Sequence, residues 1–125
     1  MKTLLYVFIG GGLGSTLRFL VSQYASKWSY WGSFPMGTFF VNILGSLLIG
    51  IFASYFIRGQ SELKFLFIAG FCGGFTTFSS FAAENISLYQ SGQWWMLILY
   101  ILLSVLGGLL AVWLGTQLMT TWLKG

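Results

Sequence analysis

Long apolar stretches, separated by short polar connectors, make up almost the whole of the 125-residue chain. Each of the four stretches is long enough for a helix of the roughly 20 residues that cross a bilayer core. The pattern therefore predicts an all-α integral membrane protein with four transmembrane helices, forming one domain over residues 1–125. The predicted spans are Leu4 to Tyr24, Gly37 to Ile57, Leu63 to Tyr89 and Trp95 to Trp122.

The connectors and span ends carry aromatic residues, which favour the lipid headgroup level of a membrane. Composition agrees with this environment, since 57% of residues are hydrophobic and 6% are charged, whereas soluble proteins usually have about a quarter of charged residues. We expect an interfacial belt made of Trp28, Tyr30, Trp31, Trp94, Trp95 and Trp122.

Charge is sparse and lies at the edges of the membrane. The net charge of +4 suits anionic lipid headgroups rather than nucleic acid. Four basic residues would lie on the side of the membrane that holds both termini. The other side would hold Lys27, and Arg18 if its side chain reaches that far. This bias favours cytoplasmic termini but allows insertion in both orientations. The four are Lys2, Arg58, Lys64 and Lys124.

Catalytic groups are scarce. The chain has no histidine, a single Cys72, and two acidic residues, Glu62 and Glu84, far apart in sequence. Enzymes need a nucleophile with a base, paired carboxylates or metal ligands. We therefore do not expect an enzyme.

The third span contains the most unusual segment, "GFCGGFTTFSSFAAE", which covers residues 70–84. Three glycines followed by Thr76 and Thr77 predict a helix that is broken in the middle of the membrane, or one that is merely kinked where glycines allow close packing. The ends of a broken helix expose carbonyl and N–H groups, which bind cations and anions respectively.

After these glycines, Phe75, Phe78 and Phe81 recur at every third position, so they share one helix face. Such a stripe is most often a packing surface. The alternative is an anion pathway, because the edge of an aromatic ring is electropositive and faces an anion that carries little water. Neighbouring serine and threonine hydroxyls would add donors without a fixed charge that traps the ion.

Three further polar side chains lie inside the predicted spans. Asn42 is costly to place in lipid without a partner. Glu84 is the intramembrane carboxylate, and we expect it to be functional or tightly paired. Arg18 is expected to have a structural role, either reaching the interface or neutralising Glu84.

These residues match a known pattern over essentially the whole chain. The segments "GGLGSTLRF", "GTFFVNILGSLLIG" and "GFCGGFTTFSSFAAE", with Tyr100 and Ser104 in the fourth span, resemble the Fluc (CrcB) family of fluoride channels. The resemblance implies an antiparallel homodimer, with the same chain inserted in both orientations of the bacterial inner membrane and two fluoride pores along the interface.

The resemblance also implies roles for particular residues. Carbonyl oxygens of Gly73 and Thr76 from both subunits would hold a structural Na⁺ ion. Ser104 would belong to a row of hydroxyl groups along the fourth span, in which Gly108 stands where a serine can occur. The fluoride pathway would be lined by Phe78, Phe81, Asn42, Thr38, Ser80, Glu84, Tyr100 and Ser104.

The leading hypothesis is thus a passive, selective channel that lets cytoplasmic fluoride leave the cell and so confers fluoride resistance. A proton-coupled exporter of the small multidrug type is an alternative, and it would need Glu84 as its titrating carboxylate. An accessory subunit that does not transport is a third possibility.

Overall fold

The structure, a computed structural model, is all-helical over residues 1–27, 32–59 and 61–125, which are the residues it describes. Its elements are α1 (Lys2–Ser26), α2 (Met36–Phe56), η1 (Phe65–Cys72), α3 (Gly73–Phe75), α4 (Phe78–Gln90) and α5 (Trp94–Lys124), of which η1 is π-helical. Of the predicted interfacial belt, Trp28, Tyr30 and Trp31 lie outside the described residues.

Four helical stretches in the described part of the chain are long and apolar enough to cross a membrane. This confirms the predicted pattern of four long apolar helices, and the helix ends differ from the predicted ones by no more than two residues. The third stretch is divided among η1, α3 and α4, and its π-helical start was not predicted. The four stretches are Lys2–Ala25, Met36–Phe56, Phe65–Gln90 and Trp94–Lys124.

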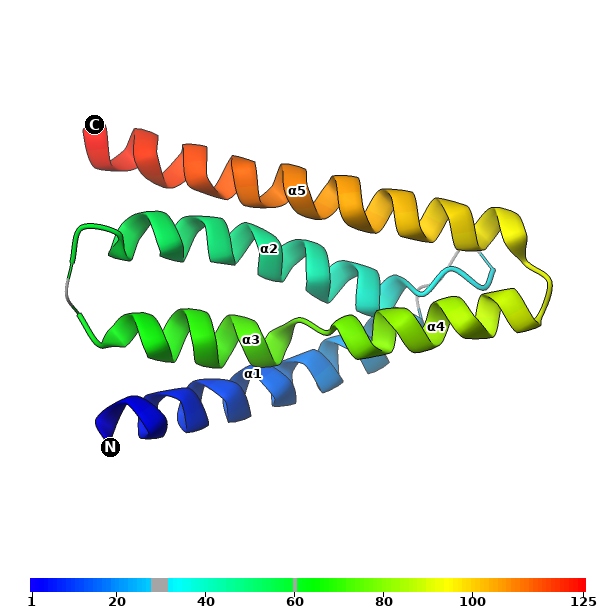
Figure 1. The fold of residues 1–125 in the computed structure, drawn as a ribbon, viewed down its shortest axis with the longest axis horizontal. Helices are drawn as coiled ribbons and strands as arrows, with labels where there is room; N and C mark the ends of the chain where they lie inside the picture. Colours follow the sequence, from blue (N-terminus) through cyan, green and yellow to red (C-terminus); the bar gives the residue numbers. More distant parts are fainter. Residues whose placement is uncertain (28–31, 60) are drawn as a thin grey trace.

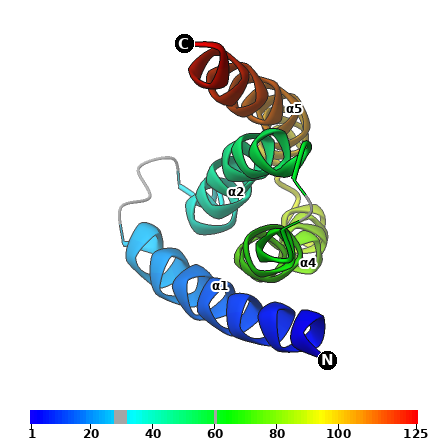
Figure 2. The same ribbon diagram turned by 90° about the vertical axis from the view of Figure 1, so that its left-hand side faces the viewer.

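The long helices run side by side, and both termini lie at the same end of the bundle (Figure 1). Figure 2, which looks along the bundle, shows α2 between α5 and the segment that contains α4. The first helix, α1, packs against η1, α3 and α2. Two segments far apart in sequence, the start of α2 and the end of α4, are thereby brought together beside α5.

Glycines set how closely the helices approach. A Cβ atom on Gly50 of α2 would collide with the carbonyl oxygen of Val112, and one on Gly115 of α5 would collide with that of Leu47. Since the obstacles are backbone atoms, which cannot rotate away, only glycine allows this contact between α2 and α5. Glycines of α1 meet the backbone of η1 in the same way at Gly10 and Gly14.

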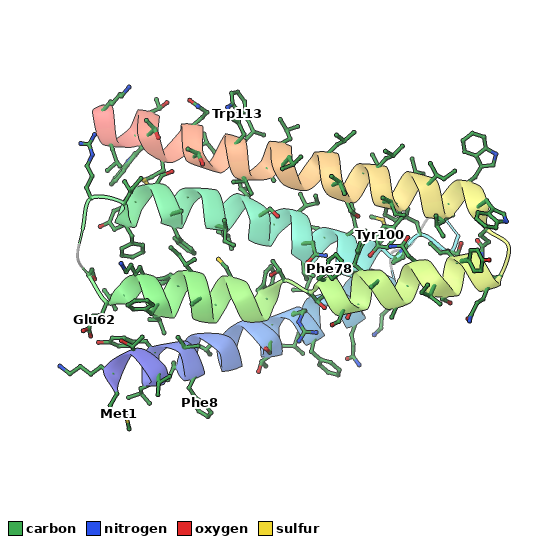
Figure 3. All side chains as sticks on the ribbon, viewed as in Figure 1. Met1, Phe8, Glu62, Phe78, Tyr100 and Trp113 are labelled. Carbon is green, nitrogen blue, oxygen red and sulfur yellow. The ribbon has the colours of Figure 1, made fainter. Side chains whose placement is uncertain are left out.

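The outer surface is strongly apolar. Phe8 and Trp113 point away from the bundle (Figure 3) and are 78% and 56% exposed. In contrast, a small core lies at the end of the bundle opposite the termini, where Phe34, Leu88 and Tyr100 are buried against one another. Apolar side chains turned outward in such numbers suit a lipid surrounding rather than water.

Candidate functional site

Two residues with extended backbone, Thr76 and Thr77, separate α3 from α4 (Figure 1), and we call them the break. Their φ and ψ angles are −91° and 161° for Thr76 and −151° and 121° for Thr77. A helix that stops and restarts leaves carbonyl groups at the first end and N–H groups at the second without helical partners. Backbone groups around the break therefore need partners from elsewhere.

Asn42 of α2 pairs with the backbone of Thr77 in both directions. Its Nδ2 donates to the Thr77 carbonyl oxygen at 3.0 Å, and the Thr77 N–H donates to Asn42 Oδ1 at 2.8 Å. Because both partners are backbone groups of fixed polarity, they also determine which way round the side-chain amide lies. The amide of Asn42 thus takes the place of a neighbouring peptide group.

The threonines of the break satisfy further groups. Thr77 Oγ1 accepts a hydrogen bond from the Ser80 N–H at 3.1 Å, an arrangement that threonine favours immediately before a helix. The N–H and the hydroxyl of Thr76 both donate to the Cys72 carbonyl oxygen, at 3.0 and 2.9 Å. One threonine therefore ends the first helix and the other begins the second.

Arg18 of α1 contacts the same region from a second neighbouring helix. Its Nε donates to the Gly74 carbonyl oxygen at 2.9 Å, and Ser15 Oγ lies 3.5 Å from that oxygen. Gly74 itself lies close against α1, since a Cβ atom there would stand 2.5 Å from the carbonyl oxygen of Gly11. The guanidinium is therefore held at the break instead of extending to the end of the bundle.

Two carbonyl oxygens near the break lose their helical donors. The Gly73 carbonyl would accept from the Thr77 N–H in an unbroken helix, but that N–H donates to Asn42. The Thr76 carbonyl would accept from the Ser80 N–H, which donates to Thr77 Oγ1 instead. Gly73 and Thr76 are the residues whose carbonyls were predicted to hold Na⁺, and carbonyl oxygens suit such a hard cation. The described residues contain no group of three His, Cys, Asp or Glu side chains that would form another kind of metal site.

A cavity of about 300 Å³ opens beside the break, between α2, α4 and α5. Phe78 and Phe81 both line it, and their ring centroids are 5.8 Å apart. Phe78 is 78% exposed and lies where α4 begins (Figure 3). No charged residue lines this cavity within the described chain, and the polar residues in its lining are Asn42, Ser46, Thr76, Thr77 and Ser104.

A second polar group lies next to the cavity, around Glu84. Its carboxylate accepts hydrogen bonds from the Thr38 hydroxyl and the Tyr100 hydroxyl, both at 2.9 Å. Thr38 and Tyr100 are buried, and the Tyr100 ring lies 5.0 Å from the Phe81 ring. Phe81 thus joins the Glu84 group to the cavity, while Arg18 and Glu84 are held by separate partners rather than by each other.

The two predicted serines are placed differently. Ser104 lines the cavity, and its Oγ is buried without a hydrogen-bond partner among the described residues. The hydroxyl of Ser80 is not part of the cavity lining, and this residue contributes its backbone N–H to the cap at Thr77. Sequence reasoning missed two contacts of Thr77. Its cap on Ser80 could have been recognised, because threonine is favoured immediately before a helix, whereas its backbone pairing with Asn42 of α2 leaves no local signal.

Comparison with known proteins identifies the family. The family described as "CrcB-like protein, Camphor Resistance (CrcB)" matches residues 5–116. The chain belongs to this family. A relative named "Fluoride-specific ion channel FluC", from Flavobacterium psychrophilum, is 49% identical over 118 residues, which cover 92% of this chain and 94% of the relative. A protein of the same name from Azobacteroides pseudotrichonymphae is 46% identical, over 92% of this chain and 94% of the relative. Another from Bacteroides fragilis is also 46% identical, over 94% of this chain and 96% of the relative. With its four apolar helices, the chain is a multi-pass bacterial membrane protein.

Proposed function

We propose that this chain forms a passive fluoride channel of the bacterial inner membrane, through which cytoplasmic fluoride leaves the cell, so that it confers fluoride resistance. Its relatives are named as fluoride-specific channels, not as enzymes or exporters. The observation that carries the proposal is the cavity beside the break, which combines two phenylalanine rings with amide and hydroxyl groups and, among the residues that the structure describes, has no charged one in its lining.

This lining suits a small anion for physical reasons. The edges of the Phe78 and Phe81 rings are electropositive and replace part of the hydration shell of the ion. Hydroxyl and amide donors, including those of Ser104 and Asn42, supply hydrogen bonds without a fixed positive charge. Fluoride enters an acid-exposed cell as neutral HF and dissociates in the more alkaline cytoplasm. Efflux through a passive pathway then follows the gradient of the anion and the negative-inside membrane potential.

A second copy of the chain, antiparallel to the first, would complete the pathway. The cavity opens on a face that carries the exposed Phe78 together with polar groups of the break and α5. We place the break in the middle of the membrane, where polar groups left open to lipid would cost several kcal/mol each. A partner that covers this face removes the cost, and antiparallel insertion brings two copies of the same face together.

We also propose that Na⁺ has a structural role between the two copies. The carbonyl oxygens of Gly73 and Thr76, which lack their helical donors, are the ligands that this chain would contribute. Two oxygens from each copy would give four, a set that suits a hard cation. The bound ion would supply positive charge that offsets the carbonyl dipoles at the break.

The two alternatives have weaker support. A proton-coupled exporter would need Glu84 free to exchange protons with a transported cation, but both of its oxygens accept hydrogen bonds, from Thr38 and Tyr100. The names of the relatives do not support this function. A non-transporting accessory subunit would release no fluoride from liposomes that contain the purified chain alone.

The test is fluoride efflux from such liposomes, read with a fluoride electrode after a potassium ionophore is added, with chloride-loaded liposomes in parallel. We expect fluoride release without chloride release. Phe78→Ile and Phe81→Ile should each lower the fluoride rate about fivefold, because an aromatic contact of this kind contributes on the order of 1 kcal/mol. Phe8→Ile is the matched control, since Phe8 is also 78% exposed but lies on α1, away from the cavity. Unchanged fluoride rates in both cavity variants would refute the aromatic pathway.

A further inference from the structure

We propose that Asn42 and Arg18 are positioning residues that hold the break open from α2 and α1, and that Asn42 thereby keeps the Gly73 carbonyl free for a cation. Their contacts with Thr77 and Gly74 join three separate helical segments at one point. This role deepens the proposed function and rests on it where sodium and fluoride are concerned.

The Thr77 N–H has two possible acceptors, the Asn42 side chain and the Gly73 carbonyl, and this choice defines the role of Asn42. Without the Asn42 carbonyl oxygen, this N–H would be unpaired in an apolar surrounding, which is costly. The nearest other acceptor for the Thr77 N–H is the Gly73 carbonyl, with which it would form the ordinary helical hydrogen bond. That bond would extend the first helix by one residue and occupy an oxygen proposed to face Na⁺. Asn42 therefore competes with the helix for the Thr77 N–H.

The hydrogen-bonding capacity of Asn42 limits any direct role toward fluoride. A side-chain amide has two N–H donors and one carbonyl oxygen. The Thr77 carbonyl uses one N–H and the Thr77 N–H uses the oxygen, which leaves one N–H that can face the cavity. The amide is also fixed in orientation by these two bonds, so it can donate to an ion from one direction only.

Arg18 acts on the carbonyl side of the same interruption. The Gly74 carbonyl would accept from the Phe78 N–H in an unbroken helix, whereas here Arg18 Nε donates to it at 2.9 Å. A hydrogen bond from a charged donor is about twice as strong as one between neutral groups. Because Gly74 also lies directly against Gly11, this bond fixes α1 on the break. Arg18 thus serves as a hydrogen-bond donor to the backbone rather than as an attracting charge in the cavity.

Amide hydrogen exchange tests the role of Asn42 without any measurement of flux. The purified protein in detergent, with sodium replaced by N-methyl-D-glucamine, would be labelled in D₂O and the exchange of the Thr77 amide followed by NMR. Asn42→Leu should speed this exchange about tenfold, because the N–H then has only the Gly73 carbonyl as its acceptor, in the fraying last turn of the first helix. Asn42→Asp keeps an acceptor oxygen and should retain most of the protection. Asn85→Leu is the matched control, since Asn85 Nδ2 donates to the Phe81 carbonyl within its own helix. An equal exchange rate of the Thr77 amide in Asn42→Leu and in the native protein would overturn the positioning role of Asn42. So would an increase in Asn85→Leu as large as that in Asn42→Leu.

Sodium binding tests the competition for Gly73. The rise in thermal midpoint on adding NaCl to protein in N-methyl-D-glucamine chloride gives an apparent sodium affinity. Asn42→Leu should weaken that affinity about tenfold or more, while Asn85→Leu leaves it unchanged. A native affinity retained in Asn42→Leu would overturn the claim that Asn42 protects the Gly73 carbonyl.

Two variants separate the possible roles of Arg18. Arg18→Met removes the donor to the Gly74 carbonyl and should speed the hydrogen exchange of the backbone amides next to Gly74. Arg18→Lys retains a donor and should keep much of the protection of these amides against exchange. Unchanged exchange in Arg18→Met would overturn the positioning role. Efflux of fluoride by the native chain is measured separately, so a failure of the proposed channel function would be distinguishable from a failure of these exchange results.

Discussion

Gly14 offers a sharp test of the packing that supports the break. A Cβ atom at this position would stand 2.9 Å from the Phe75 nitrogen and 3.1 Å from the Phe71 carbonyl carbon, with the Phe71 carbonyl oxygen nearer still. To restore ordinary contact at 3.4 Å, α1 has to withdraw by at least about 0.5 Å from the first of these atoms. Overpacking of this kind costs about 1–3 kcal/mol.

Gly12 is the matched control on the same helix. A Cβ atom there meets nothing within 4 Å, so Gly12→Ala gains about 1 kcal/mol of helix propensity without a clash. Gly14→Ala gains the same propensity in the same helix, so its free energy of unfolding should lie below that of Gly12→Ala by the overpacking cost alone, about 1–3 kcal/mol. Arg18 lies one turn beyond Gly14, so withdrawal of α1 should also weaken its 2.9 Å contact with Gly74.

The assay is reversible unfolding in mixed detergent and sodium dodecyl sulfate, followed by far-ultraviolet circular dichroism. Native protein and both variants are compared at one protein concentration, because a dimer would make stability depend on concentration. If Gly14→Ala proves as stable as Gly12→Ala, the close contact between α1 and the backbone before the break is not the constraint described above.

Three further predictions follow from individual contacts. Gly115→Ala should lower the free energy of unfolding by about 1–3 kcal/mol in the same assay. Gly108→Ala, whose Cβ would lie 3.7 Å from Ser46 Oγ, should be neutral or stabilising. Equal effects of the two substitutions would contradict the described packing of α2 against α5. Tyr100→Phe should lower the free energy of unfolding by about 1.5–3 kcal/mol, because it removes a hydrogen bond to a carboxylate. A double-mutant cycle with Thr38→Val should show an interaction energy between the two hydroxyls that bind Glu84. Strictly additive effects would mean that the two hydroxyls act independently. Replacing sodium by N-methyl-D-glucamine should lower the thermal midpoint of the native protein, and an unchanged midpoint would argue against structural Na⁺.

The helices were predictable because lipid imposes one dominant rule on the sequence. Each span must be apolar over about 20 residues, and the apolar stretches marked off along the chain end within two residues of the helices in the structure. The π-helical course of Phe65–Cys72 was not predictable in this way. The turns of α- and π-helices use the same apolar side chains, so the hydrophobic pattern does not distinguish the two.

The sequence singled out unusual polar side chains in the spans but not the contacts that they make. The rarity of polar groups in the spans pointed to Asn42, Arg18 and Glu84, since each would be costly without a partner. The identity of those partners depends on the three-dimensional arrangement. Asn42 and Arg18 both bind backbone groups, which have no signature in the sequence, and the Arg18–Glu84 pair that the sequence left open is replaced by separate contacts.

This distribution of contacts explains how charged side chains can lie within the bundle while the cavity lining remains uncharged. Hydrogen bonds commit Arg18 Nε to the Gly74 carbonyl and the two carboxyl oxygens of Glu84 to two hydroxyls. Neither residue lines the cavity beside the break. A fixed positive charge there would bind an anion too tightly for fast passage, and a fixed negative charge would exclude it. The aromatic and hydroxyl lining avoids both outcomes, and it depends on the side chains that hold the break in place.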